Sequence, residues 1–100
     1  MNSVIGRLYA VIRTRGSAWD TSCPLEDQDG WQSHAEFMDA LHAEGFVVMA
    51  GPLEGTSDAL LVIRAENDEQ IRSRLSADPW EGHLLRTTRL SPWTLRLGSL

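Results

Sequence analysis

Residues 46–63 read FVVMAGPLEGTSDALLVI and hold two apolar runs, 46–50 and 59–63, separated by turn-forming residues. Val, Ile and Phe favour strands, whereas Gly51-Pro52 and Glu54-Gly55 are typical of turns and loops. Both runs are apolar at every position and not only at alternate ones, as strands covered on both faces usually are. The stretch therefore predicts two neighbouring strands that need cover on two sides.

Upstream of this stretch, residues 31–44 show the clearest helical pattern. Large apolar side chains recur there at steps of three and four residues, and Gly45 supplies a C-terminal stop. Residues 4–12 are rich in Val, Ile, Leu and Tyr and predict a first strand. Residues 13–30 contain two glycines, a proline and several acidic residues. We predict a long polar loop there, and loops of this length often cover a functional site.

Downstream, Asn67 is placed to cap a second helix, with Gln70 three residues later as in a capping box. This helix should end before Pro79, because the residue preceding a proline is disfavoured in helical geometry. Residues 84–97 are rich in Leu, Thr and Arg and predict a last strand, bent or interrupted at Pro92.

The predicted order is strand, helix, strand, strand, helix, strand, within a single domain of residues 1–100. This order is typical of the ferredoxin-like α+β arrangement, a four-stranded antiparallel sheet with both helices on one face. The other face would expose apolar side chains to water, which a soluble monomer seldom does. We therefore expect a two-fold homodimer that pairs these faces. The alternative is that loop 13–30 folds over the open face.

Charge and cysteine content exclude some classes of partner. The net charge is −5, with 9 basic residues, all Arg, against 14 acidic ones, which argues against nucleic acid as the main partner. No apolar run exceeds five residues, so we expect no membrane partner. One cysteine, Cys23, and no secretion signal favour a cytoplasmic protein. There is no Cys cluster or HxxxH spacing, so we predict no metal site and no cofactor.

His34 and Asp78 are the candidate catalytic residues. His34 lies in the apolar stripe of the first predicted helix, near its start, where the helix dipole disfavours the charged imidazolium. Asp78 follows the second helix on the same side of the predicted sheet. A carboxylate that accepts a hydrogen bond from one ring nitrogen leaves the other as an acceptor, which makes an acid–base pair. The alternatives are a packed core histidine and an Asx-Pro turn at Asp78.

Aromatic residues flank both candidates. Trp31 and Trp80 each lie within three residues of the pair, so they can form the wall of an apolar pocket that accepts a small planar ligand. Pro52 and Leu53, after the second strand, are the other predicted substrate-binding residues. Plain core packing of the tryptophans is the alternative.

The ordered set of His34, Gly45, Gly51-Pro52-Leu53, Asp78-Pro79-Trp80 and Pro92-Trp93 resembles the YciI-like (YCII-related) domain over about residues 31–93. The resemblance implies a dimeric α+β barrel, an active site on a His–Asp pair, and lyase-like steps on small aromatic compounds. Two features depart from the family: Trp31-Gln32-Ser33 stands where an arginine often precedes the histidine, and loop 13–30 is longer. We expect a homodimeric small-molecule enzyme, lyase-like or hydrolase-like. A non-catalytic ligand-binding or accessory dimer is the alternative.

Overall fold

Strands and helices follow one another in the predicted order in the computed structural model, which describes residues 6–100. A short 3-10 turn, Leu25–Asp27, lies in the loop before the first helix. The elements are β1 (Arg7–Arg15), α1 (Trp31–Ala43), β2 (Val47–Pro52), β3 (Asp58–Ala65), α2 (Asp68–Leu75) and β4 (Leu85–Pro92). No helix within residues 6–100 is long and apolar enough to cross a membrane.

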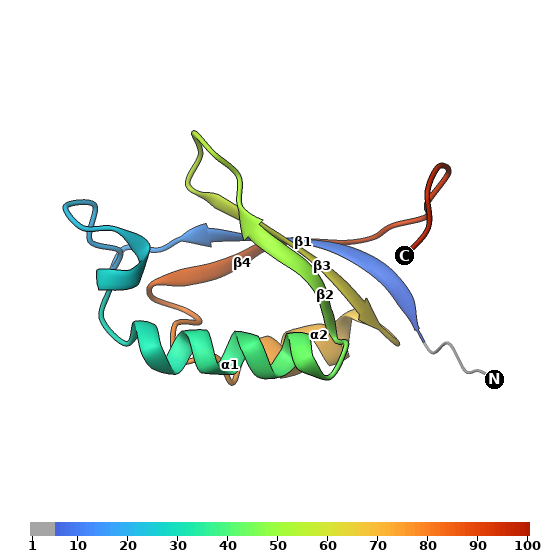
Figure 1. Ribbon diagram of the computed structural model, residues 1–100, viewed down its shortest axis with the longest axis horizontal. Coiled ribbons are helices and arrows are strands. Elements are labelled where there is room, and N and C mark those ends of the chain that lie inside the picture. Colours follow the sequence, from blue (N-terminus) through green and yellow to red (C-terminus); the bar gives the residue numbers. More distant parts are fainter. Residues whose placement is uncertain (1–5) are drawn as a thin grey trace.

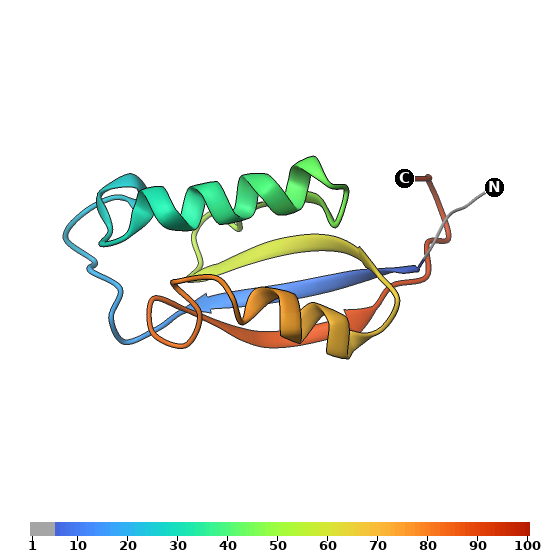
Figure 2. The ribbon, with the colours of Figure 1, turned by 90° about the horizontal axis from the view of Figure 1, so that it is seen from below.

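The four strands form one antiparallel sheet in the order β2-β3-β1-β4. Both helices lie on the same face of this sheet, below it in Figure 1 and in front of it in Figure 2. The predicted small α+β fold with a four-stranded antiparallel sheet and two helices is therefore confirmed.

The main core fills the space between the sheet and the two helices. Every second residue of β1 and β3 points into it, among them Val11 and Ile63, which have no exposed surface. From the helices, Leu41 of α1 and Ile71 and Leu75 of α2 close the same cluster. This alternation follows from the two-residue side-chain period of a strand and places one full face of the sheet against the helices.

Strand β1 extends three residues beyond its predicted end at Ile12. Arg13 pairs with Ala59 of β3 and with Thr87 of β4, so both neighbouring strands continue the ladder. The prediction that Arg13 begins the polar loop is therefore wrong, and the loop starts at Gly16. The last strand ends at Pro92, where the sequence predicts a bend or an interruption, and the backbone N–H of Trp93 still donates to the Leu8 carbonyl at 2.8 Å. The predicted strand residues 4–5 lie outside the described residues.

The predicted cap of α2 is present in a modified form. The Asn67 side chain accepts a hydrogen bond from the backbone N–H of Gln70 at 2.8 Å. The Gln70 side chain bonds the backbone N–H of Glu66 at 2.8 Å, one residue before the cap. The turn that starts α2 is thus closed from both sides, as in a capping box displaced by one residue.

The loop between β1 and α1 packs on the helix side of the molecule. Its apolar anchors, Trp19 and Leu25, contact a second cluster formed by Trp80, Leu84 and Leu85. The alternative in which this loop covers the open face is therefore wrong. The open face carries Ala10, Ile12 and Leu60 beside a shallow hollow, and Trp93 at its edge is 42% exposed.

Candidate active site

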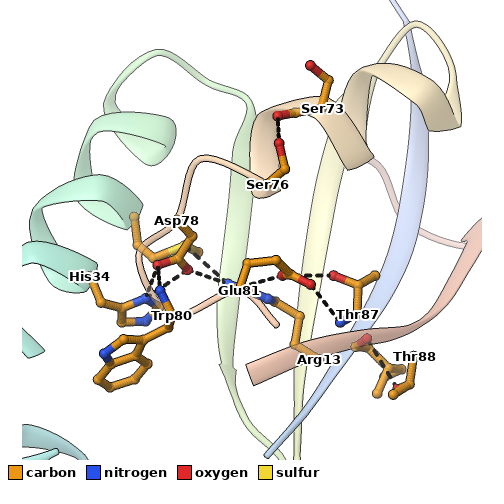
Figure 3. A network of polar contacts seen from close by, with 11 residues as sticks. Arg13, His34, Ser73, Ser76, Asp78, Trp80, Glu81, Thr87 and Thr88 are labelled. Carbon is orange, nitrogen blue, oxygen red and sulfur yellow. Dashed lines mark hydrogen bonds and ion pairs between the residues drawn. The ribbon is translucent and has the colours of Figure 1, made fainter. Parts of the chain in front are cut away.

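The predicted contact between His34 and Asp78 is present (Figure 3). His34 lies in the first turn of α1, and its Nδ1 is 2.8 Å from Oδ2 and 3.0 Å from Oδ1 of Asp78. Both residues are buried. Because an ionised carboxylate only accepts hydrogen bonds, Nδ1 donates to it, and in the neutral form of the ring Nε2 then keeps its lone pair.

The turn that follows α2 fixes the Asp78 carboxylate. Its Oδ1 accepts a hydrogen bond at 2.9 Å from the backbone N–H of Trp80, two residues on. This is the Asx-Pro turn that the sequence offered as the alternative explanation for Asp78. Turn and histidine contact therefore coexist, since one carboxylate has lone pairs enough for both.

An arginine that the sequence analysis missed completes the buried network. Nη1 of Arg13 lies 2.7 Å from Oδ2 of Asp78, and Nη2 lies 2.7 Å from Oε1 of Glu81. The arginine is 1% exposed. Its Nε is buried and has no hydrogen-bond partner within the described part of the chain. Only the inward positions Val11 and Tyr9, two and four residues before it, could have indicated that Arg13 faces the core.

Opposing effects act on the pKa of Asp78. Burial raises it, but hydrogen bonds from His34, the Trp80 backbone and Arg13, together with the charge of Arg13, outweigh burial and leave the pKa below its usual value. The carboxylate is therefore ionised at neutral pH, and it is held by three donors in one orientation.

Trp80 forms the platform under the imidazole. The two rings stack with centroids 4.0 Å apart and planes within 7° of parallel. Trp80 itself is fixed, because its Nε1 donates to the Asp29 carbonyl at 2.7 Å and Trp19 meets it edge-on at 5.8 Å. Trp31 lies 5.9 Å from both His34 and Trp80. Two indoles, those of Trp80 and Trp31, therefore restrict rotation of the histidine ring.

A cavity of about 310 Å³ opens beside this stack. Its lining includes the predicted residues Trp31, His34, Pro52 and Trp80. Leu53 lies outside the lining, because it starts the tight β2–β3 turn, where its N–H and carbonyl bond Asp58 and Thr56. Asp78 also lies outside it, behind the imidazole. Since Nδ1 faces Asp78, Nε2 is the ring nitrogen that remains for a ligand.

Gln28 holds the loop that forms the outer wall of the cavity. It is buried, and its Nε2 donates to the carbonyls of Asp20 at 2.7 Å and Cys23 at 3.0 Å. Its Oε1 accepts from the Asp20 N–H at 2.9 Å. The loop is therefore folded around one amide, which keeps Trp19 and Leu25 at the cavity. No sequence pattern points to Gln28 beyond its polar neighbours.

Chemically, the site offers a base, a cation and an aromatic wall. Within residues 6–100, no group of three or more His, Cys, Asp or Glu side chains is arranged to hold a metal ion.

No protein-family model matches the sequence, and a comparison with curated proteins finds no match.

Proposed function

We propose that the protein is a small-molecule enzyme in which Nε2 of His34 removes a proton from a bound substrate and returns it. The observation that carries this proposal is the His34 imidazole at a cavity wall, with its Nδ1 against the Asp78 carboxylate. General bases of this kind need a fixed tautomer, a lone pair aimed at the ligand, and exclusion of bulk water.

The chemistry of one turnover follows from the contacts. Nε2 takes a proton from carbon or oxygen of the substrate, and the electron pair of the broken bond stays on the substrate. The imidazolium formed lies against the Asp78 carboxylate and the face of Trp80, both of which stabilise a cation. Return of the proton to another substrate atom gives an isomerisation. Return to a departing group gives a lyase-like elimination.

The strand order and the single helix-covered face support a ferredoxin-like protomer, and with it the resemblance to the YciI-like domain. In this chain the guanidinium nearest the His–Asp pair comes from β1 through Arg13. It does not come from the residues just before the histidine. We propose membership of that family on the ordered motifs and the fold together.

The open face of the sheet supports a homodimer. Met49 is 51% exposed there and Trp93 is 42% exposed, beside the hollow between Ile12, Leu60 and Ser91. The β2–β3 turn and the C-terminal segment both project on this side, opposite the helices (Figure 1). Light scattering should give twice the mass of one chain. The exposed-edge variant Trp93→Arg should halve that mass, and a wild-type monomer would refute the dimer.

A non-catalytic ligand-binding protein is the second candidate, and one observation favours it. Asp78 accepts hydrogen bonds from Arg13 and the Trp80 backbone as well as from His34, so this carboxylate has a structural role that requires no reaction. On this view the imidazole satisfies one more buried acceptor, and the cavity binds a ligand that leaves unchanged.

Proton transfer separates the two candidates. Small cyclic acids, ketones and phenols are first screened for binding through tryptophan fluorescence. Those that bind are then incubated in heavy water and followed by NMR for deuterium incorporation or elimination. His34→Gln should slow the reaction by about 10²- to 10⁴-fold, the usual contribution of a general base. His83→Gln, a change at an exposed histidine outside the cavity, should leave it unchanged. Binding without exchange or turnover for every ligand supports the second candidate.

A further inference from the structure

We infer that the cavity selects small planar organic anions, aromatic or conjugated carboxylates, whose negative group lies against Arg15 at the rim. This inference rests on the proposed function, because it names the substrate class of the same site. It is carried by the placement of one cation and three indoles around the imidazole.

Arg15, the last residue of β1, lines the cavity and is exposed to solvent. Its guanidinium carbon lies 4.5 Å above the ring of Trp19, so the face of the cation is covered by the indole. Among residues 6–100, no carboxylate lies within ion-pairing distance of it. Stacking leaves the N–H groups at the edge of the guanidinium available, and these are the donors that bind a carboxylate in a two-pronged manner.

The other charged groups of the lining are already engaged. Arg13 is paired with Asp78 and Glu81. Asp58 accepts a hydrogen bond from the Thr14 hydroxyl at 2.7 Å. Thr14 lies between Arg13 and Arg15 in β1, so its side chain and the carboxylate bonded to it lie on the opposite face of the sheet. Arg15 is therefore the one attractive charged partner that the lining offers to an anionic ligand.

The apolar walls determine the rest of the ligand. Trp19, Trp31 and Trp80 present ring surfaces, with Leu25, Met38 and Leu61 among the other lining residues. Flat rings pack well on such walls. A cavity of about 310 Å³ lies at the lower end of the range for small-molecule sites, which fits one ring with its substituents.

Three ligands with the same ring test the inference: benzoate, benzamide and benzylamine, which are anionic, neutral and cationic. Binding is measured by tryptophan fluorescence and calorimetry on wild type and Arg15→Gln, with Arg86→Gln as the control at an exposed arginine of β4 outside the cavity. Wild type and Arg86→Gln should bind benzoate about tenfold more tightly than benzamide, and Arg15→Gln should bind both alike. Arg15→Lys should recover only part of the preference for benzoate over benzamide, because lysine lacks the planar guanidinium that stacks on Trp19 and donates two parallel hydrogen bonds.

Salt dependence of the wild type gives a second measurement that needs no variant. Between about 50 and 500 mM NaCl the affinity for benzoate should fall while that for benzamide stays constant, since an exposed cation is screened. Equal binding of benzoate and benzamide, tighter binding of benzylamine, an unchanged Arg15→Gln, or no binding of benzoate overturns the inference. Benzoate selectivity through Arg15 without proton transfer to any ligand would instead refute the proposed function alone.

Discussion

Replacing Arg13 by methionine should destabilise the protein more than any surface charge removal. The substitution keeps a long side chain but leaves the Asp78 carboxylate, whose side chain has no exposed surface, with the donors of His34 and the Trp80 backbone and without the arginine. Breaking a buried ion pair by removing one partner costs about 3–5 kcal/mol. A domain of this size has a total free energy of unfolding of about 5–15 kcal/mol. At about 4 °C or more per kcal/mol, the melting temperature should fall by at least roughly 12 °C.

A double-mutant cycle isolates the contribution of the pair. Urea unfolding followed by tryptophan fluorescence at neutral pH gives the free energy of unfolding of wild type, Arg13→Met, Asp78→Asn and the double variant. The double variant should be more stable than the two single losses predict, by about 1.5–3 kcal/mol, because it leaves no unpaired charge at the buried position 78. Glu44→Gln, which removes a partly exposed pair with Arg74, should cost only about 0–1 kcal/mol.

The result that would refute this reasoning is a coupling free energy below about 0.5 kcal/mol between Arg13 and Asp78, the limit for independent sites. An Arg13→Met variant as stable as Glu44→Gln would lead to the same conclusion. Either result would mean that Arg13 does not hold the carboxylate and that the orientation of His34 has another origin.

Three further predictions concern acid stability, the close approach at Gly16 and the loop. The pKa of Asp78 is lowered in the folded protein, so as the pH falls below 3.8 the unfolded chain binds the proton first and the free energy of unfolding decreases. Measured by urea unfolding at a series of acidic pH values, this decrease should be smaller in Asp78→Asn. Gly16→Ala should destabilise strongly in thermal unfolding, because its Cβ would come 2.1 Å from the His83 carbonyl, whereas Gly51→Ala meets nothing within 4 Å and should be tolerated. Gln28→Ala should release the loop, which should weaken ligand binding and speed proteolytic cleavage within the loop. If neither the affinity nor the cleavage rate changes, Gln28 does not hold the loop in place.

The sequence predicts the sheet and helices well because local patterns determine them. The apolar runs around Val47 and Leu61, the helical spacing after Trp31 and the cap at Asn67 each require only near neighbours in the chain. Strand ends were predicted less well. The continuation of β1 to Arg15 depends on pairing with β3 and β4, and those partners lie more than 40 residues away.

The candidate site divides in the same way. The meeting of His34 and Asp78 was predictable because the fold brings the start of α1 to the end of α2. The inward orientation of Arg13 was not, because a charged residue at an inward strand position contradicts the apolar pattern. Only the two carboxylates across the interior, Asp78 and Glu81, make its burial tolerable. The prediction that Leu53 lines the cavity is wrong, because the geometry of the turn after β2 cannot be deduced from the residue types in that turn.

The arginine that competes with His34 for Asp78 also determines how the cluster responds to a proton. Arg13 carries one positive charge against the carboxylates of buried Asp78 and partly exposed Glu81, so the cluster has a formal charge of −1 in the state in which His34 is neutral. In the proposed reaction Nε2 takes up a proton, and the formal charge of the cluster then becomes zero. Arg13 and the Trp80 backbone hold the Asp78 carboxylate independently of His34. A base that gains its charge in a prearranged environment loses little energy to reorganisation, which is the property that proton-transfer catalysis requires.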